Sequence, residues 1–91
     1  MAKISCKVMI KNDLGLHIRP ATAIVKMLQK TQASVFFTCK NETVNARSIM
    51  SILMLMAKKK SKIMITVDGS DAEKTMQMLV QAFDHRFGEQ T

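Results

Sequence analysis

The 91-residue chain contains no tryptophan or tyrosine, and only two cysteines, three glycines and one proline. Two cysteines are too few for a disulfide framework, and Cys6 and Cys39 lack the spacing of a metal-binding or redox pair. We expect both to be buried free thiols on inward strand positions. No apolar run approaches the roughly 20 residues of a membrane-spanning helix. Charge from Lys3 onward is not the pattern of a signal peptide. We therefore expect a soluble cytoplasmic protein without membrane insertion.

Acidic residues are also scarce. The chain has 14 lysines and arginines against seven aspartates and glutamates, a net charge of +7. This balance favours acidic partners: an acidic protein face, nucleic acid or phosphate. However, the sequence has no basic tail, no interleaving of aromatic and basic residues and no zinc-finger or recognition-helix spacing. A small basic nucleic-acid-binding domain remains an alternative, but no motif indicates it and we do not expect a nucleic-acid partner.

The hydrophobic pattern switches between the periods of strands and helices. Period-two alternation predicts strands at 3–10, 34–39 and 62–67, and a short strand at 43–44 after a tight turn at 41–42. Alternating strands indicate a sheet with one covered face and one wet face, which is typical of antiparallel sheets.

Helical periodicity predicts three helices between these strands. The first begins near Ile18 and runs for about three turns, and the second begins after Asn45 or at Ser48. The third starts with a capping box, Ser70 to Glu73, and ends at Gly88. The second helix is expected to bury Ile49, Ile52, Leu53 and Met56.

The predicted order is β-α-β-β-α-β-α. Three helices on one face of a four-stranded antiparallel sheet make an α+β open-faced β-sandwich, and we expect residues 1–91 to form a single domain.

His17 lies in the segment GLHIRPAT, ahead of the only proline in the chain. Pro20 has no N–H and so belongs in the first turn of a helix, which places the helix start close to His17. A helix N-terminus carries unpaired N–H groups and a partial positive charge. No Asp or Glu occupies residues 17–25, and Arg19 adds a permanent charge. The segment therefore predicts an oxyanion site, above all for phosphate, in preference to a histidine that merely caps or packs.

An imidazole beside an anion site can act as a nucleophile. The helix terminus and Arg19 disfavour the imidazolium, so we expect a neutral ring that can attack phosphorus near pH 7. The chain has no Walker loop, kinase Gly-rich loop or metal-binding carboxylate cluster. We expect no cofactor and no metal, and a carrier that exchanges phosphoryl groups with partner enzymes but is not itself an enzyme.

Two motifs make the chain similar to a known family. "GLHIRPATAIVKML" resembles the phosphohistidine signature of HPr, the phosphocarrier of the phosphoenolpyruvate-dependent sugar phosphotransferase system, and "VNARSIMSIL" resembles the second signature of that family. The resemblance implies an HPr-like open-faced β-sandwich. It also implies that His17 accepts phosphate on Nδ1 from phosphorylated enzyme I and passes it to enzyme II A components, with Arg19 assisting.

Ser48 matches the serine that an ATP-dependent HPr kinase/phosphorylase phosphorylates in many bacteria. Its place before Ile-Met also suits a plain helix N-cap, and the two roles are compatible. The sequence leaves open a regulatory HPr-like protein that signals through His17 and Ser48 without serving sugar transport.

A partner-facing surface is expected where the first two helices begin. Met50 is the candidate for exposure, because its flexible side chain suits a surface that meets several partners. We expect a monomer, with His85 on the surface and without chemistry. The expected surface consists of Ile18, Ile49, Met50 and Leu53, rimmed by Lys26 and Arg47, which would meet acidic partner surfaces.

Overall fold

The structure is a computed structural model that describes residues 2–90. Its elements follow the predicted order, with a short 3₁₀ turn added at the end. They are β1 (Ala2–Met9), α1 (Ile18–Leu28), β2 (Ser34–Cys39), β3 (Glu42–Asn45), α2 (Ile49–Met54), β4 (Lys62–Gly69), α3 (Ala72–Asp84) and η1 (Arg86–Gly88).

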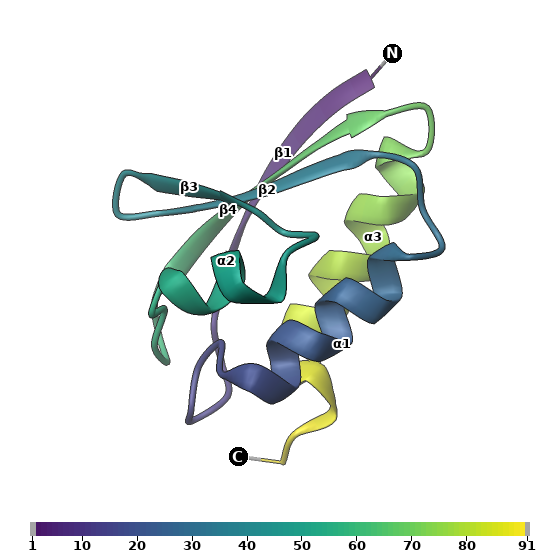
Figure 1. The fold of residues 1–91 in the computed structure, drawn as a ribbon. Helices are drawn as coiled ribbons and strands as arrows, with labels where there is room; N and C mark the ends of the chain where they lie inside the picture. The colour runs from purple at the N-terminus through teal and green to yellow at the C-terminus, as the bar shows by residue number, and fades with distance from the viewer. Residues whose placement is uncertain (1, 91) are drawn as a thin grey trace.

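The four strands form one sheet in the order β1-β4-β2-β3, and every neighbouring pair is antiparallel. The β1–β4 ladder pairs Ile4 with Val67 and Val8 with Ile63, which places alternate side chains of both strands on the same face. All three helices lie on one side of the sheet (Figure 1). This arrangement confirms the expected α+β open-faced sandwich.

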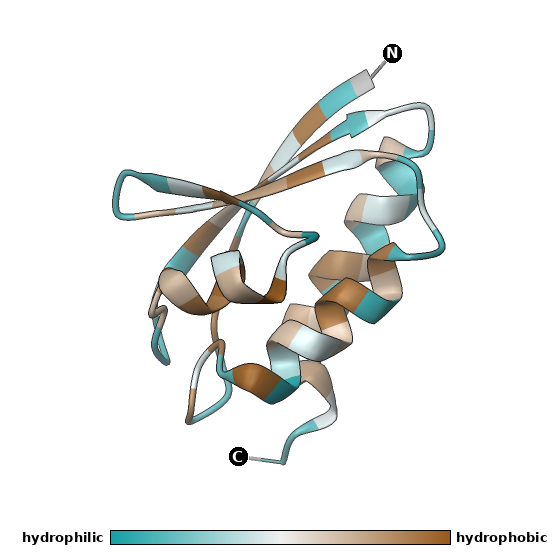
Figure 2. Cartoon of the chain, in the orientation of Figure 1, coloured by the Kyte–Doolittle hydropathy of each residue, from teal (hydrophilic) through white to brown (hydrophobic). Residues whose placement is uncertain are grey.

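The core lies between the sheet and the helices. Ile63, Ile65 and Val67 of β4 are buried as their alternation predicts, and Figure 2 shows hydrophobic and hydrophilic residues alternating along the strands. Phe37 of β2 meets Phe83 of α3 edge to face, with ring centroids 5.7 Å apart. Both cysteines are free thiols. Cys39 is buried as expected, whereas Cys6 is only half-buried on the edge strand β1, so its predicted full burial is wrong. Among residues 2–90, no helix has the length and apolar character that crossing a membrane requires.

The hairpin between β2 and β3 turns one residue earlier than predicted. Lys40 and Asn41 have positive φ values of 49° and 70°. Two consecutive left-handed residues form the turn that matches the twist of a two-residue hairpin. As a result β3 is longer than the predicted strand and begins at Glu42.

The second helix buries less than predicted. Ile52 is fully buried, but Met56 lies beyond the helix end with φ of 51° and is 76% exposed, so its predicted burial is wrong. The connection to β4 contains a second left-handed residue, Lys60, with φ of 73°. Its N–H donates to the carbonyl of Ile10 at 2.8 Å, which ties this glycine-poor segment to the end of β1.

Both ends of α3 also differ from the sequence prediction. The N-cap is Asp71 and not Ser70, and the Asp71 carboxylate accepts from the N–H of Gln32 at 2.8 Å instead of capping its own helix. The helix ends at Asp84, ahead of Gly88. The chain then reverses, and Figure 1 shows the yellow C-terminal segment returning toward the first turn of α1.

Candidate functional site

A close backbone contact seats the loop before α1. Gly15 has φ of 67°, and a Cβ at this position would lie 2.3 Å from the carbonyl oxygen of Ala57. The same carbonyl accepts from the N–H of Leu16 at 3.0 Å. A side chain cannot occupy this space, so glycine allows the loop to rest on the segment that follows α2.

His17 is the N-cap residue of α1, as the position of Pro20 predicts. Its backbone is extended, with φ of −81° and ψ of −170°, and its carbonyl accepts the first intrahelical hydrogen bond from Ala21 at 3.1 Å. Its side chain makes no capping hydrogen bond. Pro20 has no backbone N–H. In the first turn of α1, the N–H groups without an intrahelical acceptor are therefore those of Ile18 and Arg19.

A carboxylate from the far end of the chain contacts the imidazole of His17. Nε2 of His17 lies 2.9 Å from Oε2 and 3.1 Å from Oε1 of Glu89. The Glu89 side chain is 11% exposed and that of His17 is 25% exposed. The sequence predicted no acidic side chain at this helix terminus; this holds for residues 17–25 but is wrong for the folded site.

Asn12 links the loop to the same carboxylate. It is buried, and its amide nitrogen donates to the carbonyl of Gly15 at 2.7 Å and to Oε1 of Glu89 at 2.8 Å. Both amide hydrogens are thus used, which orients the carboxylate toward His17. Sequence analysis missed Asn12 and Glu89, because neither belongs to a periodic pattern and only the folded tail brings them together.

The environment of Glu89 favours its charged form. Burial opposes ionisation, but hydrogen bonds from His17 and Asn12 and the charge of Arg19 outweigh it, so the pKa of Glu89 is lowered from its ordinary value of 4.5. Nη1 of Arg19 lies 3.7 Å from Oε2 of Glu89, and the Arg19 side chain is 79% exposed. Most of the guanidinium is therefore open to an incoming anion.

Ser48 begins α2 as its N-cap, which confirms that structural prediction. Its Oγ accepts from the N–H of Ser51 at 3.2 Å, and its backbone is extended. The residue is half-buried at the start of α2, a helix that packs against α1. Whether Ser48 is also a modification site stays a prediction.

Arg47 has contacts that the sequence did not indicate. Its guanidinium donates to the carbonyl of Leu28 at 2.7 Å, to the carbonyl and hydroxyl of Thr31, and to the carbonyl of Ala33 at 2.6 Å. A cation that hydrogen-bonds the last carbonyls stabilises the C-terminal end of a helix. The partner-binding role expected for Arg47 stays a prediction, and these internal contacts lend it no support.

The expected partner surface is exposed in part. Ile18 is 64% exposed and Met50 is 69% exposed, whereas Ile49 and Leu53 are half-buried and pack against the core. Lys26 is exposed on α1. Other large exposed apolar side chains, which the sequence analysis did not assign to this surface, are Met9, Leu14, Phe36, Met54 and Met56.

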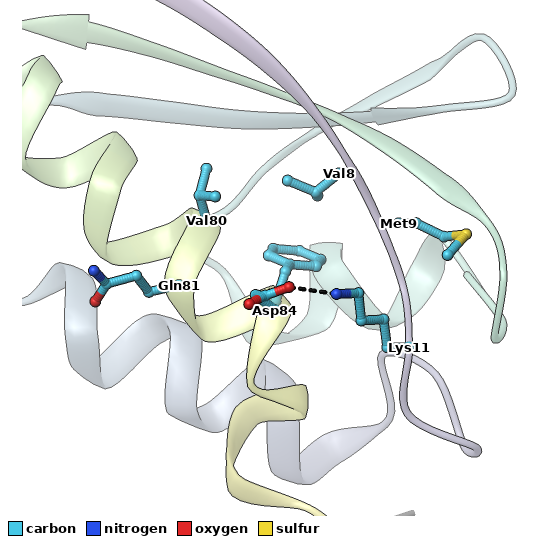
Figure 3. A pocket seen from close by; sticks show the side chains of 7 residues that line it. Val8, Met9, Lys11, Val80, Gln81 and Asp84 are labelled. Atoms are coloured by element: carbon cyan, nitrogen blue, oxygen red, sulfur yellow. Dashed lines mark hydrogen bonds and ion pairs between the residues drawn. The ribbon is translucent and has the colours of Figure 1, made fainter.

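A separate cavity of about 210 Å³ lies between β1 and α3, lined in part by Val8, Met9 and Val80. Lys11 and Asp84 form an ion pair there (Figure 3). None of the residues around His17 lines this cavity.

His85 follows α3 and is exposed, as predicted. Within residues 2–90, no three side chains of the metal-binding types gather into a cluster.

Comparisons with known proteins agree on one family. The family model described as "PTS HPr component phosphorylation site" matches residues 4–85. A phosphocarrier protein HPr of Chlamydia muridarum is 42% identical over 87 residues, which cover 96% of this chain and 84% of the relative. The crystal structure of an HPr from Thermoanaerobacter tengcongensis is 32% identical with a TM-score of 0.89, covering 100% of both chains. An HPr from Bacillus anthracis is 35% identical with a TM-score of 0.86, covering 91% of this chain and 99% of the other.

Proposed function

Because the chain belongs to the HPr family of phosphocarrier proteins of the phosphotransferase system, we propose that His17 is the residue that carries its phosphoryl group. The protein is a phosphoryl carrier and not an enzyme in its own right. The observation that supports His17 most strongly is the placement of its imidazole. The ring lies at the N-terminal end of α1 beside Arg19, with Nε2 held by Glu89. No hydrogen bond within residues 2–90 involves Nδ1.

The first turn of α1 offers the donors that a phosphoryl group on Nδ1 requires. Ile18 and Arg19 each present a backbone N–H without an intrahelical acceptor, and the positive end of the helix dipole favours the anion. The guanidinium of Arg19 adds several donors in a planar fork that suits phosphate oxygens. Arg19 would thus exchange its long contact with Glu89 for closer ones with the phosphoryl group.

The proposed donor is phosphorylated enzyme I, and the proposed acceptors are enzyme II A components. The exposed side chains of Ile18 and Met50 supply an apolar surface, and Lys26 a positive charge, for partners with acidic faces. The free thiols of Cys6 and Cys39 suit a reducing compartment, so we propose that the protein lies in the cytoplasm. We also propose that it acts as a monomer.

Ser48 is proposed as a second, regulatory phosphorylation site, for an ATP-dependent HPr kinase/phosphorylase. As the N-cap of α2 it lies next to Ile49 and Met50, so a phosphate there would change the charge of the proposed docking surface. Transfer from the phosphorylated protein to an A component would indicate a transport role. Phosphorylation without such transfer would indicate a regulatory one.

Incubation with phosphoenolpyruvate and enzyme I, followed by intact mass measurement, tests the site. We expect the wild type to gain one phosphoryl group, which is lost in acid. We expect His17→Ala to gain no acid-labile phosphoryl group. His85→Ala is the matched control, because it removes an exposed histidine outside the site. Acid-labile phosphate on His17→Ala would overturn the assignment.

A further inference from the structure

We propose that Glu89 is a positioning residue for phosphoryl transfer: its carboxylate keeps the proton of His17 on Nε2, so that Nδ1 presents the lone pair to phosphorus. This inference rests on the proposed role of His17. It adds a residue from the C-terminal segment to a site that the sequence placed entirely at the start of α1.

The hydrogen bonds around Glu89 allow only one tautomer of a neutral His17 ring. A carboxylate can only accept, so the contact of 2.9 Å with Nε2 requires Nε2 to be the donor. In a neutral imidazole the other nitrogen, Nδ1, must then lack a proton. Asn12 donates to the other carboxylate oxygen at 2.8 Å and holds the carboxylate in place. The 11% exposure of Glu89 limits competition from water.

The backbone before Glu89 is in a conformation that side chains disfavour. Arg86, Phe87 and Gly88 have φ values of 56°, 54° and 83° in succession. Non-glycine residues rarely occupy this region, and such outliers gather at functional sites. The ring of Phe87 packs on Phe83 with centroids 4.9 Å apart, which anchors the turn. The turn reverses the chain after α3 and places the Glu89 carboxylate in contact with the His17 ring.

The transfer step needs no proton movement when Nε2 keeps its hydrogen. The Nδ1 lone pair forms a bond to the phosphorus of the phosphoryl donor, and the bond from phosphorus to the donor atom breaks, leaving its electron pair on the donor. The phosphorylated ring carries one positive charge, which the Glu89 carboxylate faces. In the onward transfer the electron pair returns to Nδ1 and restores the neutral ring. A carboxylate that orients an imidazole and stabilises its charged form is known from hydrolase triads.

Glu89→Ala, Glu89→Gln and Glu89→Asp test the proposal in the full chain, with Glu73→Gln as the control. Glu73 is an exposed carboxylate in the first turn of α3, so its variant makes the same charge change away from His17. Two quantities are measured for each variant: the ¹⁵N shifts of the His17 ring, which report the tautomer, and the rate of phosphorylation by enzyme I.

We expect the wild type and Glu73→Gln to hold the proton on Nε2 and to react at equal rates. Glu89→Ala should show mixed tautomers and about tenfold slower phosphorylation, as loss of one charge-assisted hydrogen bond implies. Glu89→Gln should keep the tautomer through its amide oxygen and still react more slowly, while Glu89→Asp should recover part of the rate. An unchanged tautomer and rate in Glu89→Ala, or a faster rate, would overturn the proposal. In either case phosphate would still appear on His17, so the failure is distinct from a wrong phosphorylation site.

Discussion

Oε2 of Glu89 lies 2.9 Å from Nε2 of His17, although the two residues are 72 positions apart in the chain. The contact joins the last turn of the molecule to the first turn of α1 and completes the surroundings of the imidazole. Because Asn12 and Arg19 also face this carboxylate, four side chains from three segments share one small site. The ionisation of Glu89 therefore reports whether the site is assembled.

The Glu89 carboxyl should titrate below its ordinary pKa of 4.5, because the hydrogen bonds from His17 and Asn12 outweigh its burial. A lowered folded pKa means that the unfolded chain binds more protons in this range. The stabilisation is then fully present above the unfolded pKa and is lost as pH falls through the lowered value. Carboxyl ¹³C shifts followed from pH 7 to 2 check this, with Asn12→Ala expected to raise the midpoint. A wild-type midpoint at or above 4.5 would contradict the contact.

Substituting Gly15 should cost more stability than substituting Gly88. Gly15→Ala combines φ of 67° with a Cβ placed 2.3 Å from the backbone oxygen of Ala57, so we expect a loss of at least about 2 kcal/mol. Gly88→Ala has φ of 83° but nothing within 4 Å of the added Cβ, so only the left-handed strain of about 1 kcal/mol applies. Denaturant unfolding of both variants measures the difference. Equal losses would show that the close approach at Gly15 relaxes freely.

Arg47→Met should destabilise the fold by about 2–3 kcal/mol, since it removes charged hydrogen bonds to three backbone carbonyls at the end of α1 and after it. For a domain of this size the melting temperature should fall by roughly 10–20 °C. Lys26→Met is the matched control, because it removes an exposed cation from the last turn of α1, the helix whose end Arg47 contacts. If Arg47→Met has the melting temperature of the wild type but is phosphorylated more slowly by enzyme I, Arg47 acts at the partner surface.

The sequence predicted the elements and the His17 segment well because both depend on local signals. Alternation identified the strands, and Pro20 placed the start of α1 next to His17. Met56 and the end of α3 were missed, because left-handed turns without glycine carry no propensity signal. The contact between Glu89 and His17 depends on such a turn, at Phe87. No pattern within the first helix could have revealed a carboxylate that arrives from the other end of the chain.

Ser48→Asp should leave the melting temperature nearly unchanged and slow the phosphorylation of His17. Aspartate is also a good N-cap and its charge lies at the favourable end of the helix, so α2 should tolerate it. The added negative charge beside Met50 should repel an acidic partner, and the defect should shrink as salt is raised. Rates with enzyme I at low and high salt measure this effect. A wild-type rate at low salt would remove Ser48 from the docking surface, whereas early melting would point to a structural role.

The most direct measurement of the central claim is the one-bond coupling between ³¹P and ¹⁵N in the uniformly labelled protein after phosphorylation by enzyme I and phosphoenolpyruvate. It identifies both the residue and the ring nitrogen that carry the phosphoryl group. With Nε2 of His17 engaged by Glu89, we predict a single coupling, to Nδ1 of His17. A coupling to Nε2 of His17, or to either nitrogen of His85, would contradict the account.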